Sequence, residues 1–500
     1  MTRLAWFLAW RSLWDRPVRT LLLLGGYGIG VAVMIALLSV GEALLAQARD
    51  RDLVAGGDLV LLPEGVDPTV LKVNGVTDLD FTIQQAEFIV REVLNGPRFG
   101  PEVAAVAPQI DARQVYVRSR GEVRAAIASA GIPSLDQAAH ATGAVAGASD
   151  TGADRAWIAP AGAAVLDRLD RFHEPPAAVS RAWAEWDYFN FVDPATGAYG
   201  YLTILAGGEG RGAVLLRLRR PGHPADDLVL RAAIHRGDLS FTSASQRVGP
   251  ARVWNDAGRY RITVSAPEVH ADLRLAPDPR SYLPPAEVAG GGGVSGYVVP
   301  VVHGWMDGQI RTAHTALQLA HVPAYHDHNW GTWGGVTWEW GEAAGAGGAA
   351  LYGGLHVAGM DAAASIGRPP VLFVWEAERH DGRTAPGGFL GAFAVQAIHY
   401  TAWHPGPVVS GRRVSVPGAI TVEGEAGPDR MRLEIRVRDA LASVPAEASP
   451  AGPPPDGRSQ TPRVAFLQLR GNAQVRGTVD GRSVAFSGNA AAETFVPVER

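Results

Sequence analysis

The chain has 500 residues, and at the usual ~100–200 residues per domain this length predicts two to four folded units. An apolar fraction of 47% is typical of a globular chain with a large core, and it excludes both a multi-span membrane protein and a disordered chain. The net charge of −5 is small for this length and excludes the basic surface of a nucleic-acid-binding protein. Cysteine is absent, which excludes disulfides, thiol catalysis and thiolate metal sites.

The first long apolar stretch spans residues 20–46, roughly 27 residues against the ~20 that a helix needs to cross hydrocarbon. Positive charge is concentrated before it, at Arg3, Arg11, Arg16 and Arg19. Because cytoplasmic flanks carry an excess of arginine, we expect a transmembrane helix over 20–46 and a cytoplasmic N-terminus. The sequence therefore predicts a single-pass protein of the inner (cytoplasmic) membrane, with the bulk of the chain extracytoplasmic, in the periplasm.

The residues on either side of this segment refine the topology. In the cytoplasmic segment 1–19, Trp6, Trp10 and Trp14 recur every four residues, which is typical of one face of an amphipathic helix on the membrane surface. Ala46-Gln47-Ala48 has the small-x-small form of a signal-peptidase site, so a cleavable signal peptide is the alternative. The long apolar core and the extended charged leader favour the anchor.

Three short motifs near the N-terminus resemble a transporter component. Arg11-Ser12-Leu13-Trp14 and Arg19-Thr20-Leu21-Leu22 resemble the first helix of permeases of the MacB/FtsX type. The run from Gly56 to Pro63 is similar to the start of their extracytoplasmic domain. This resemblance covers residues 1–140 and implies an ABC transport system. Because the other membrane helices and a Walker motif are missing from the sequence, the permease and the ATPase are expected to be separate partner chains.

Residues 47–140 are predicted to form a small α/β unit. Residues 58–62 and 114–118 have the apolar pattern of strands, and residues 82–94 carry apolar side chains at helical spacing. The following residues 141–170 begin with a stretch rich in Ala, Gly, Ser and Thr, which predicts a linker.

Beyond the linker, many short strands are separated by Gly, Pro and Asp turns, with few long helices. This pattern predicts a mainly β chain with sandwich or barrel architecture. The Gly/Ala-rich run 341–350 is taken as the boundary between two β lobes, over residues 171–345 and 346–500. The Pro-rich run 444–462 is predicted to be a surface loop.

One constellation of acidic and aromatic residues stands out. His303-Gly304-Trp305 is followed by the run from Tyr325 to Gly331, whose sequence is Tyr-His-Asp-His-Asn-Trp-Gly, and then by Trp338-Glu339-Trp340. If the second segment is a strand, Tyr325, Asp327 and Asn329 share one face. The opposite face then carries His326, His328 and Trp330. An acid, an imidazole, a phenol and an indole can therefore line one cavity.

This set of side chains points to acid catalysis. An aspartate in an aromatic-walled pocket should have a raised pKa and stay protonated. A protonated carboxyl can deliver a proton to an alkene, and an indole face can stabilise the resulting carbocation. The combination suits acid-catalysed addition of water to an isolated double bond, or a cyclisation.

The same motifs, with the run from Glu185 to Asn190, resemble the CrtC/AttH family over about residues 170–500. That family includes carotenoid 1,2-hydratases (hydroxyneurosporene synthases) and proteins encoded beside ABC transporters. The resemblance implies two lipocalin-like β lobes, and it implies a catalytic set of Asp327, His303, Tyr325 and Trp305. The expected ligand-binding residues are Trp186, Tyr188, His326, His328, Asn329, Trp330, Trp338 and Trp340. Asp187 departs from the family pattern, which usually carries a second tryptophan there.

Other interpretations of these residues stay open. A zinc site would need His303 or His356 to converge with the histidine pair, and neither a metal nor another cofactor is expected. The tryptophans can simply be core, and Asp327 can serve only to satisfy buried hydrogen bonds.

Three functional hypotheses follow. The leading one is a membrane-anchored, lipocalin-like protein that binds a hydrophobic ligand, a lipid or an isoprenoid, as an accessory to an ABC transport system. The alternative is a hydratase or cyclase of an isoprenoid- or carotenoid-like alkene, which would be a hydro-lyase with Asp327 as proton donor. The third is a purely structural partner of a permease.

Overall fold

The computed structural model describes residues 10–11, 17–18, 34, 59–63, 81–96, 98–119, 122–139, 147–158, 162–290, 293–333, 336–357, 370–377, 387–443 and 464–498. The predicted transmembrane helix over 20–46 lies outside these residues, apart from Met34. The predicted surface loop 444–462 lies outside them as well. Among the described residues, no helix combines the length and the apolar character that a membrane crossing requires.

The chain divides into two compact units, residues 1–81 with 105–150, and residues 82–104 with 151–500. The first unit contains the antiparallel hairpin of β1 (Gln109–Ser119) and β2 (Glu122–Gly131), followed by the short helix α5 (Pro133–Ala138). The predicted strand at 114–118 lies inside β1. The predicted helix at 82–94 is α4 (Ile83–Asn95), which begins at a capping box between Thr82 and Gln85 and belongs to the second unit.

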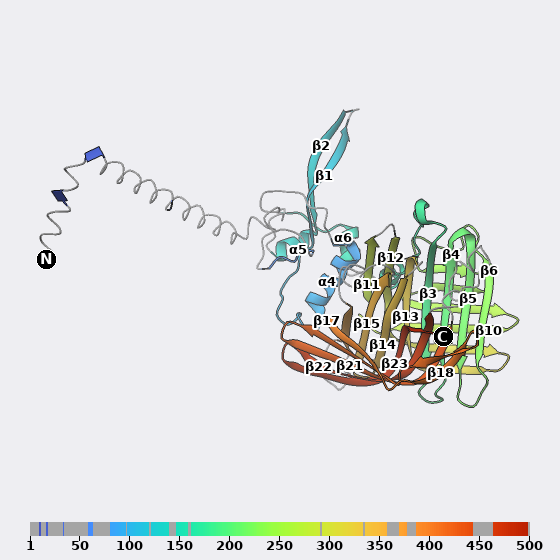
Figure 1. The fold of residues 1–500 in the computed structure, drawn as a ribbon. Coiled ribbons are helices and arrows are strands. Elements are labelled where there is room, and N and C mark those ends of the chain that lie inside the picture. Colours follow the sequence, from blue (N-terminus) through green and yellow to red (C-terminus); the bar gives the residue numbers. More distant parts are fainter. Residues whose placement is uncertain are drawn as a thin grey trace, which may run out of the picture. The chain divides into compact units, whose positions relative to one another are not determined.

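An 11-stranded antiparallel sheet forms the N-terminal lobe of the second unit, shown mainly in green and yellow in Figure 1. Its strands are β3 (Trp183–Val192), β4 (Tyr199–Gly207), β5 (Arg211–Arg219), β6 (Asp226–Ala233), β7 (Ser245–Val248), β8 (Ala251–Asp256), β9 (Arg259–Ala266), β10 (Val269–Pro277), β11 (Leu283–Gly290), β12 (Gly293–Thr312) and β13 (Ala316–Thr332). The strand order is β6-β5-β4-β3-β13-β12-β10-β9-β8-β7, with β11 paired to β12.

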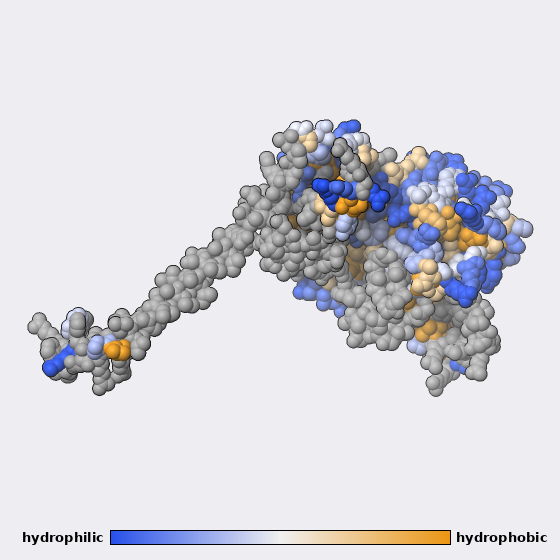
Figure 2. All heavy atoms as spheres, turned by 90° about the horizontal axis from the view of Figure 1, so that it is seen from above, coloured by the Kyte–Doolittle hydropathy of each residue, from blue (hydrophilic) through white to orange (hydrophobic). Residues whose placement is uncertain are grey.

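This lobe has a filled interior. Alternate residues of β3, β4 and β5, such as Phe189, Ile204 and Leu216, meet residues of β9, β10 and β12 in one buried cluster. On the outer strand β6 only Asp226 is buried, and half-buried and exposed residues alternate after it. In Figure 2 hydrophilic residues accordingly separate smaller hydrophobic patches on the face that it draws.

A closed barrel forms the C-terminal lobe, in orange and red in Figure 1. Its strands, in barrel order, are β14 (Val336–Gly345), β15 (Gly348–Val357), β16 (Val371–Glu376), β17 (Gly388–Thr401), β20 (Ala419–Ala426), β21 (Asp429–Ser443), β22 (Val464–Val479) and β23 (Arg482–Pro497). A separate hairpin joins β18 (His404–Val409) to β19 (Arg412–Val416). The prediction of a mainly β chain with barrel-like sheets and few helices is confirmed.

The Gly/Ala-rich run 341–350 does not separate the lobes. It forms the hairpin between β14 and β15 inside the barrel, and the N-terminal sheet already ends at Thr332. Small residues are needed there because a Cβ on Gly345 would stand 2.1 Å from the Ser487 carbonyl oxygen. Gly348 also has a φ of +155°, which side chains rarely adopt.

Three elements lie between the first unit and β3. The helices α6 (Gly152–Ile158) and α7 (Gly162–Leu169) occupy much of the predicted linker 141–170, and the 3₁₀ turn η2 (Ala177–Val179) follows them. Val165 and Leu169 of α7 are buried together with Phe88 of α4. The apolar spacing within 162–169 is what docks this segment, although its surrounding composition is typical of a linker.

Candidate functional site

The two lobes meet through one face of each sheet. On the N-terminal lobe this face carries alternate residues of β3 and β13, among them Tyr188 and Tyr325. On the barrel it carries alternate outward residues of β14 and β16, among them Trp340 and Trp375. These residues form one buried cluster, so the layer between the lobes is walled by aromatic rings. We refer to this layer as the interlobe site.

Asp327 lies at the centre of the interlobe site and is only 4% exposed. Its Oδ2 accepts a hydrogen bond from the Tyr325 hydroxyl at 2.9 Å and a long one from the Tyr297 hydroxyl at 3.5 Å. Its Oδ1 accepts a hydrogen bond from the Asn329 amide at 2.9 Å. The strand alternation predicted for 325–330 is therefore present, and it gathers Tyr325, Asp327 and Asn329 on one face.

Burial favours the protonated form of this carboxyl. Desolvation raises the pKa of Asp327 well above its usual range, and the nearby Glu493 carboxylate raises it further. The hydrogen bond from Tyr325 opposes this shift without cancelling it. Burial likewise raises the pKa of Tyr325 and of Tyr297, so both phenols stay protonated. The site therefore holds a neutral acid in an apolar wall.

Aromatic rings surround this acid. The Trp340 ring lies 5.4 Å from the Tyr325 ring and 5.7 Å from the Tyr188 ring, in both cases edge to face. Its indole nitrogen donates to the Tyr297 hydroxyl at 3.0 Å. Phenol and indole faces at this spacing can stabilise a developing positive charge.

A second group of tryptophans is half-buried at the margin of the same layer. Trp333 packs on Trp186 at 4.6 Å and on Trp338 at 5.9 Å between ring centroids. Trp338 donates its indole hydrogen to Glu493 at 2.9 Å, and Glu493 also accepts from Gln468 at 3.0 Å. These rings therefore form a partly exposed apolar margin of the interlobe site.

His303 and Trp305 gather around a different carboxylate. The Nδ1 of His303 lies 2.5 Å from Asp278, and the Trp305 indole donates to the same carboxylate at 2.8 Å. The Trp305 ring is stacked on His321 at 4.1 Å. The Nε2 of His303 is buried and has no protein partner among the described residues. Asp278 therefore fixes the imidazole and leaves one nitrogen free for chemistry.

His326 and His328 were expected to line the ligand, but the structure buries them on the interior face of the N-terminal lobe. The His326 Nε2 lies 3.0 Å from Asp170, and the His328 nitrogens lie 2.8 Å from Asp170 and 2.8 Å from Glu185. Both rings are 0% exposed. Successive side chains of a strand point to opposite faces, so His326 and His328 lie on the face of β13 opposite to Asp327.

This buried cluster also contains the groups best placed to hold a metal. The sets His173, Glu185, His328 and Asp170, Asp187, His328 each bring their ligand atoms within 4.8 Å of one another. Burial alone would lower the pKa of His328, but its hydrogen bonds with Asp170 and Glu185 raise the pKa well above the usual value. An imidazolium shared between two carboxylates thus balances the charge of this cluster.

Trp330 also lies outside the interlobe site. It is 2% exposed, and its ring stacks on His173 at 4.1 Å on the interior side of β13. Of the twelve residues predicted for the site, the interlobe layer brings together Tyr325, Asp327, Asn329, Trp186, Tyr188, Trp338 and Trp340. His303 and Trp305 are not among them, because both are held by Asp278.

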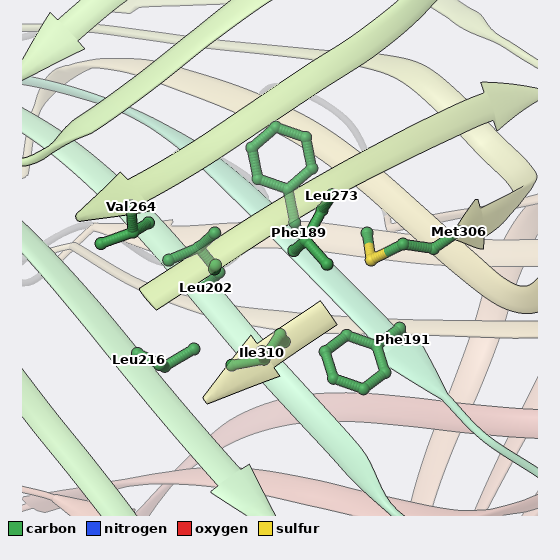
Figure 3. A pocket seen from close by; sticks show the side chains of 9 residues that line it. Phe189, Phe191, Leu202, Leu216, Val264, Leu273, Met306 and Ile310 are labelled. Carbon is green, nitrogen blue, oxygen red and sulfur yellow. The ribbon is translucent and has the colours of Figure 1, made fainter. Parts of the chain in front are cut away.

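The interior of the N-terminal lobe contains a small cavity among the described residues. Its cavity, of about 10 Å³, is lined by apolar side chains including Phe191, Leu202 and Met306, which point into it in Figure 3. A space of this size holds at most one water, and an apolar lining keeps it dry. A ligand of the predicted size therefore does not fit into this cavity.

Several site residues carried no signal in the sequence. Tyr297 lies in β12, and nothing local in the sequence connects it with Trp340, which is 43 residues away. Asp278 lies in a turn before Pro279, and Glu493 and Arg470 sit in strands with no recognisable motif. Only pairing between distant strands brings these residues to the site.

No family profile matches the chain, and no curated protein is similar to it in sequence. Among solved structures, CghA bound to Sch210972 is similar at 13% identity over 63% of this chain and 89% of that one, with a TM-score of 0.41. A putative AttH of Nitrosomonas europaea (15%, 63% and 92%, TM-score 0.38) and kievitone hydratase of Nectria haematococca (10%, 66% and 98%, TM-score 0.38) are also similar. At TM-scores below 0.5 these similarities do not support a functional assignment. A function must therefore be argued from the residues of this chain.

Proposed function

We propose that the interlobe site protonates an isolated double bond of an apolar, isoprenoid-like alkene and adds water to the resulting cation. The observation that carries this proposal is Asp327, a carboxyl kept protonated by burial and oriented by the Tyr325 hydroxyl. General acid catalysis of this kind requires a protonated carboxyl at the working pH, and aromatic faces beside it stabilise the cation that forms.

The reaction balances with the chain's own groups and water. The Asp327 carboxyl forms a C–H bond to one alkene carbon, and the neighbouring carbon becomes cationic. The faces of Trp340 and Tyr188 stabilise that cation. Water then adds to the cation and releases a proton, which restores the Asp327 carboxyl. His303, held by Asp278 through Nδ1, has a free Nε2 that can orient the attacking water.

A carrier of an apolar ligand is the second candidate. The half-buried indoles of Trp186, Trp333 and Trp338 favour it, because they offer an apolar entrance without supplying any reactive group. A carrier would bind the same class of ligand but would release it unchanged.

Labelled water separates the two candidates. The full chain is incubated with acyclic isoprenoid alkenes in H₂¹⁸O, and the products are analysed by mass spectrometry. Asp327→Asn keeps the shape of the carboxyl but removes its transferable proton, so label incorporation should fall by ~10²–10⁴ while ligand affinity stays close to wild type. Asp272→Asn is the matched control, since that side chain is 48% exposed and lies on β10. If wild type incorporates no label across the panel, the carrier replaces the enzyme.

The cellular setting of this reaction is a separate proposal. From the arginine bias before residue 20, we propose that the chain is held at the inner membrane with its β lobes in the periplasm. The resemblance of residues 1–140 to a permease supports an association with separate permease and ATPase chains.

A further inference from the structure

Arg470 is a buried cation on the barrel side of the interlobe site. It is 7% exposed, and it lies on β22, where it pairs with Ala491 of β23. One guanidinium nitrogen, Nη1, donates to the Ala490 carbonyl oxygen. The other, Nη2, is buried without a hydrogen-bond partner, and Arg470 forms no ion pair with any other residue that the structure describes.

The acids near Arg470 leave its charge incompletely balanced. Glu342 of β14 faces it across Ala491, which pairs with both residues. Burial raises the pKa of Glu342 to about 7 even though Arg470 and His303 lower it, so this carboxyl is partly protonated at neutral pH. Asp439 pairs with Arg470 in the sheet, but its carboxylate accepts the Tyr199 hydroxyl at 2.5 Å.

The opposite wall adds two polar side chains. The Asn190 Nδ2 and the Tyr188 hydroxyl are buried without a hydrogen bond of normal geometry among the described residues. Both belong to β3, where Asn190 lies between Tyr325 of β13 and Tyr201 of β4. Asn190 lies near enough to Glu342 and Tyr188 to lower the pKa of both. The Tyr188 and Tyr201 hydroxyls both act electrostatically on Arg470. Polar side chains of both lobes therefore lie within electrostatic range of Arg470, beside the aromatic cluster.

Buried polar groups normally have partners, and a buried guanidinium normally has an anionic one. The guanidinium of Arg470 has one nitrogen, Nη2, without an acceptor among the described residues, and a charged fork of this kind suits an oxygen anion. A hydrocarbon would leave Nη2 without a partner. This position also belongs to the same layer as Asp327, on the face that Trp340 shares with Glu342.

We propose that Arg470 binds an anionic oxygen, a carboxylate or an enolate, carried by the ligand that occupies the interlobe site. This proposal rests on the proposed function and narrows its substrate class to an apolar alkene with an acidic oxygen group, in place of a pure hydrocarbon. Arg470 then fixes which end of the molecule enters, and so which double bond reaches Asp327.

A pair of probes that differ only in the oxygen group tests this assignment. Retinoic acid and retinol are the acid and the alcohol of one polyene, and quenching of tryptophan fluorescence in the full chain measures the binding of each. Wild type should bind the acid about 10- to 100-fold more tightly than the alcohol, as expected for a hydrogen bond to a charged group. Equal affinities in wild type would overturn the proposal without any variant.

Arg470→Gln keeps a donor but removes the charge, so it should bring the affinity for the acid down to that for the alcohol. The affinity for the alcohol should change by less than about threefold. Arg432→Gln is the matched control, since Arg432 is 52% exposed on the neighbouring strand β21 and should change neither affinity. An equal loss for both probes in Arg470→Gln would show a packing role and overturn the proposal. Should that variant not fold, the wild-type comparison still decides.

The outcome for Arg470 is separable from the outcome for Asp327. Asp327→Asn should retain the preference for the acid in full, because the carboxyl of Asp327 is not needed for binding. If wild type binds the acid more tightly than the alcohol but incorporates no label from H₂¹⁸O, the anion site stands and the hydratase proposal fails. If wild type incorporates label but binds both probes equally, the hydratase proposal stands and the anion site fails.

Discussion

The Tyr325 hydroxyl donates to the Asp327 carboxyl across 2.9 Å, from a position two residues earlier on the same face of β13. This short link is local in sequence, yet its surroundings come from four other strands, through Tyr297, Tyr188, Trp340 and Glu493. The acid and its orienting phenol are therefore supplied by one strand, while the apolar wall that sets their protonation is supplied by both lobes.

Asp327→Asn should gain stability relative to wild type as the pH rises. The pKa of Asp327 is raised by folding, so the folded state binds more protons than the unfolded state above the ordinary aspartate pKa. The free energy of unfolding of wild type therefore falls between pH ~4 and the raised pKa, and the asparagine variant lacks this loss. Urea unfolding at several pH values measures the difference. If the stability of the variant relative to wild type instead falls with rising pH, Asp327 is ionised and hydrogen-bonded in the folded protein.

Tyr325→Phe should shift the pH dependence of turnover upward. The Tyr325 hydroxyl stabilises the ionised form of Asp327, and its removal should raise the pKa of this carboxyl further. Because the protonated form is the catalytic one, the rate should fall at a higher pH than in wild type. Tyr116→Phe, at an exposed position on β1, is the control for the loss of a hydroxyl. An unchanged falling limb would mean that another group limits the rate.

His328→Gln should destabilise the N-terminal lobe by ~3–5 kcal/mol, because it leaves Asp170 and Glu185 buried without their shared cation. Despite burial, His326 and then His328 hold the pKa of Asp170 below the usual value, and hydrogen bonds with His173 and His328 do the same for Glu185. Their contribution is present above the unfolded carboxyl pKa and is lost as the pH falls.

The contribution of His328 itself has the opposite sign. Since its pKa is raised, the stability that it adds is present below the unfolded histidine pKa and is lost as the pH rises. The cost of His328→Gln should therefore be greatest at pH ~5–6.5. Urea unfolding across pH 4–9 tests this, with the exposed His270→Gln as control. A cost that does not change with pH would contradict the charged network.

A reporter fused after Ala48 should be active in the periplasm and inactive in the cytoplasm, since the arginines before residue 20 keep the N-terminus inside. Paired alkaline phosphatase and green fluorescent protein fusions measure this. Fluorescence with no phosphatase activity would reverse the topology and remove the periplasmic setting of the reaction.

Much of the fold was predictable because the alternation of apolar and polar residues along a strand is visible in the sequence. Alternation along 325–330 predicted which residues of β13 share a face, and helical spacing over 82–94 predicted α4 within a residue of its start. The prediction of a lobe boundary within 341–350 is wrong, because these residues form the hairpin at 345–348. A glycine-rich composition is typical of both a tight turn and a flexible linker, so it does not distinguish them.

The site was predictable only in its local part. Tyr325, Asp327 and Asn329 follow from one strand, and Trp338 and Trp340 from another. The roles of Asp278, Glu493 and Arg470 depend on pairing between strands far apart in the sequence, which no short motif encodes. His326 and His328 belong to the same motif as Asp327, but their partners lie earlier in the chain, Asp170 at the end of the predicted linker and Glu185 on β3.

The barrel closes where β23 pairs with β14, and that seam places Glu493 beside Trp340. A growing chain therefore exposes the aromatic face of the N-terminal lobe from the time β13 emerges until residues near 493 have left the ribosome. Without the cover of the barrel, Asp327 loses the desolvation and the nearby Glu493 that raise its pKa. On the proposed mechanism, a protein truncated before β23 should therefore be inactive even where its first lobe is folded.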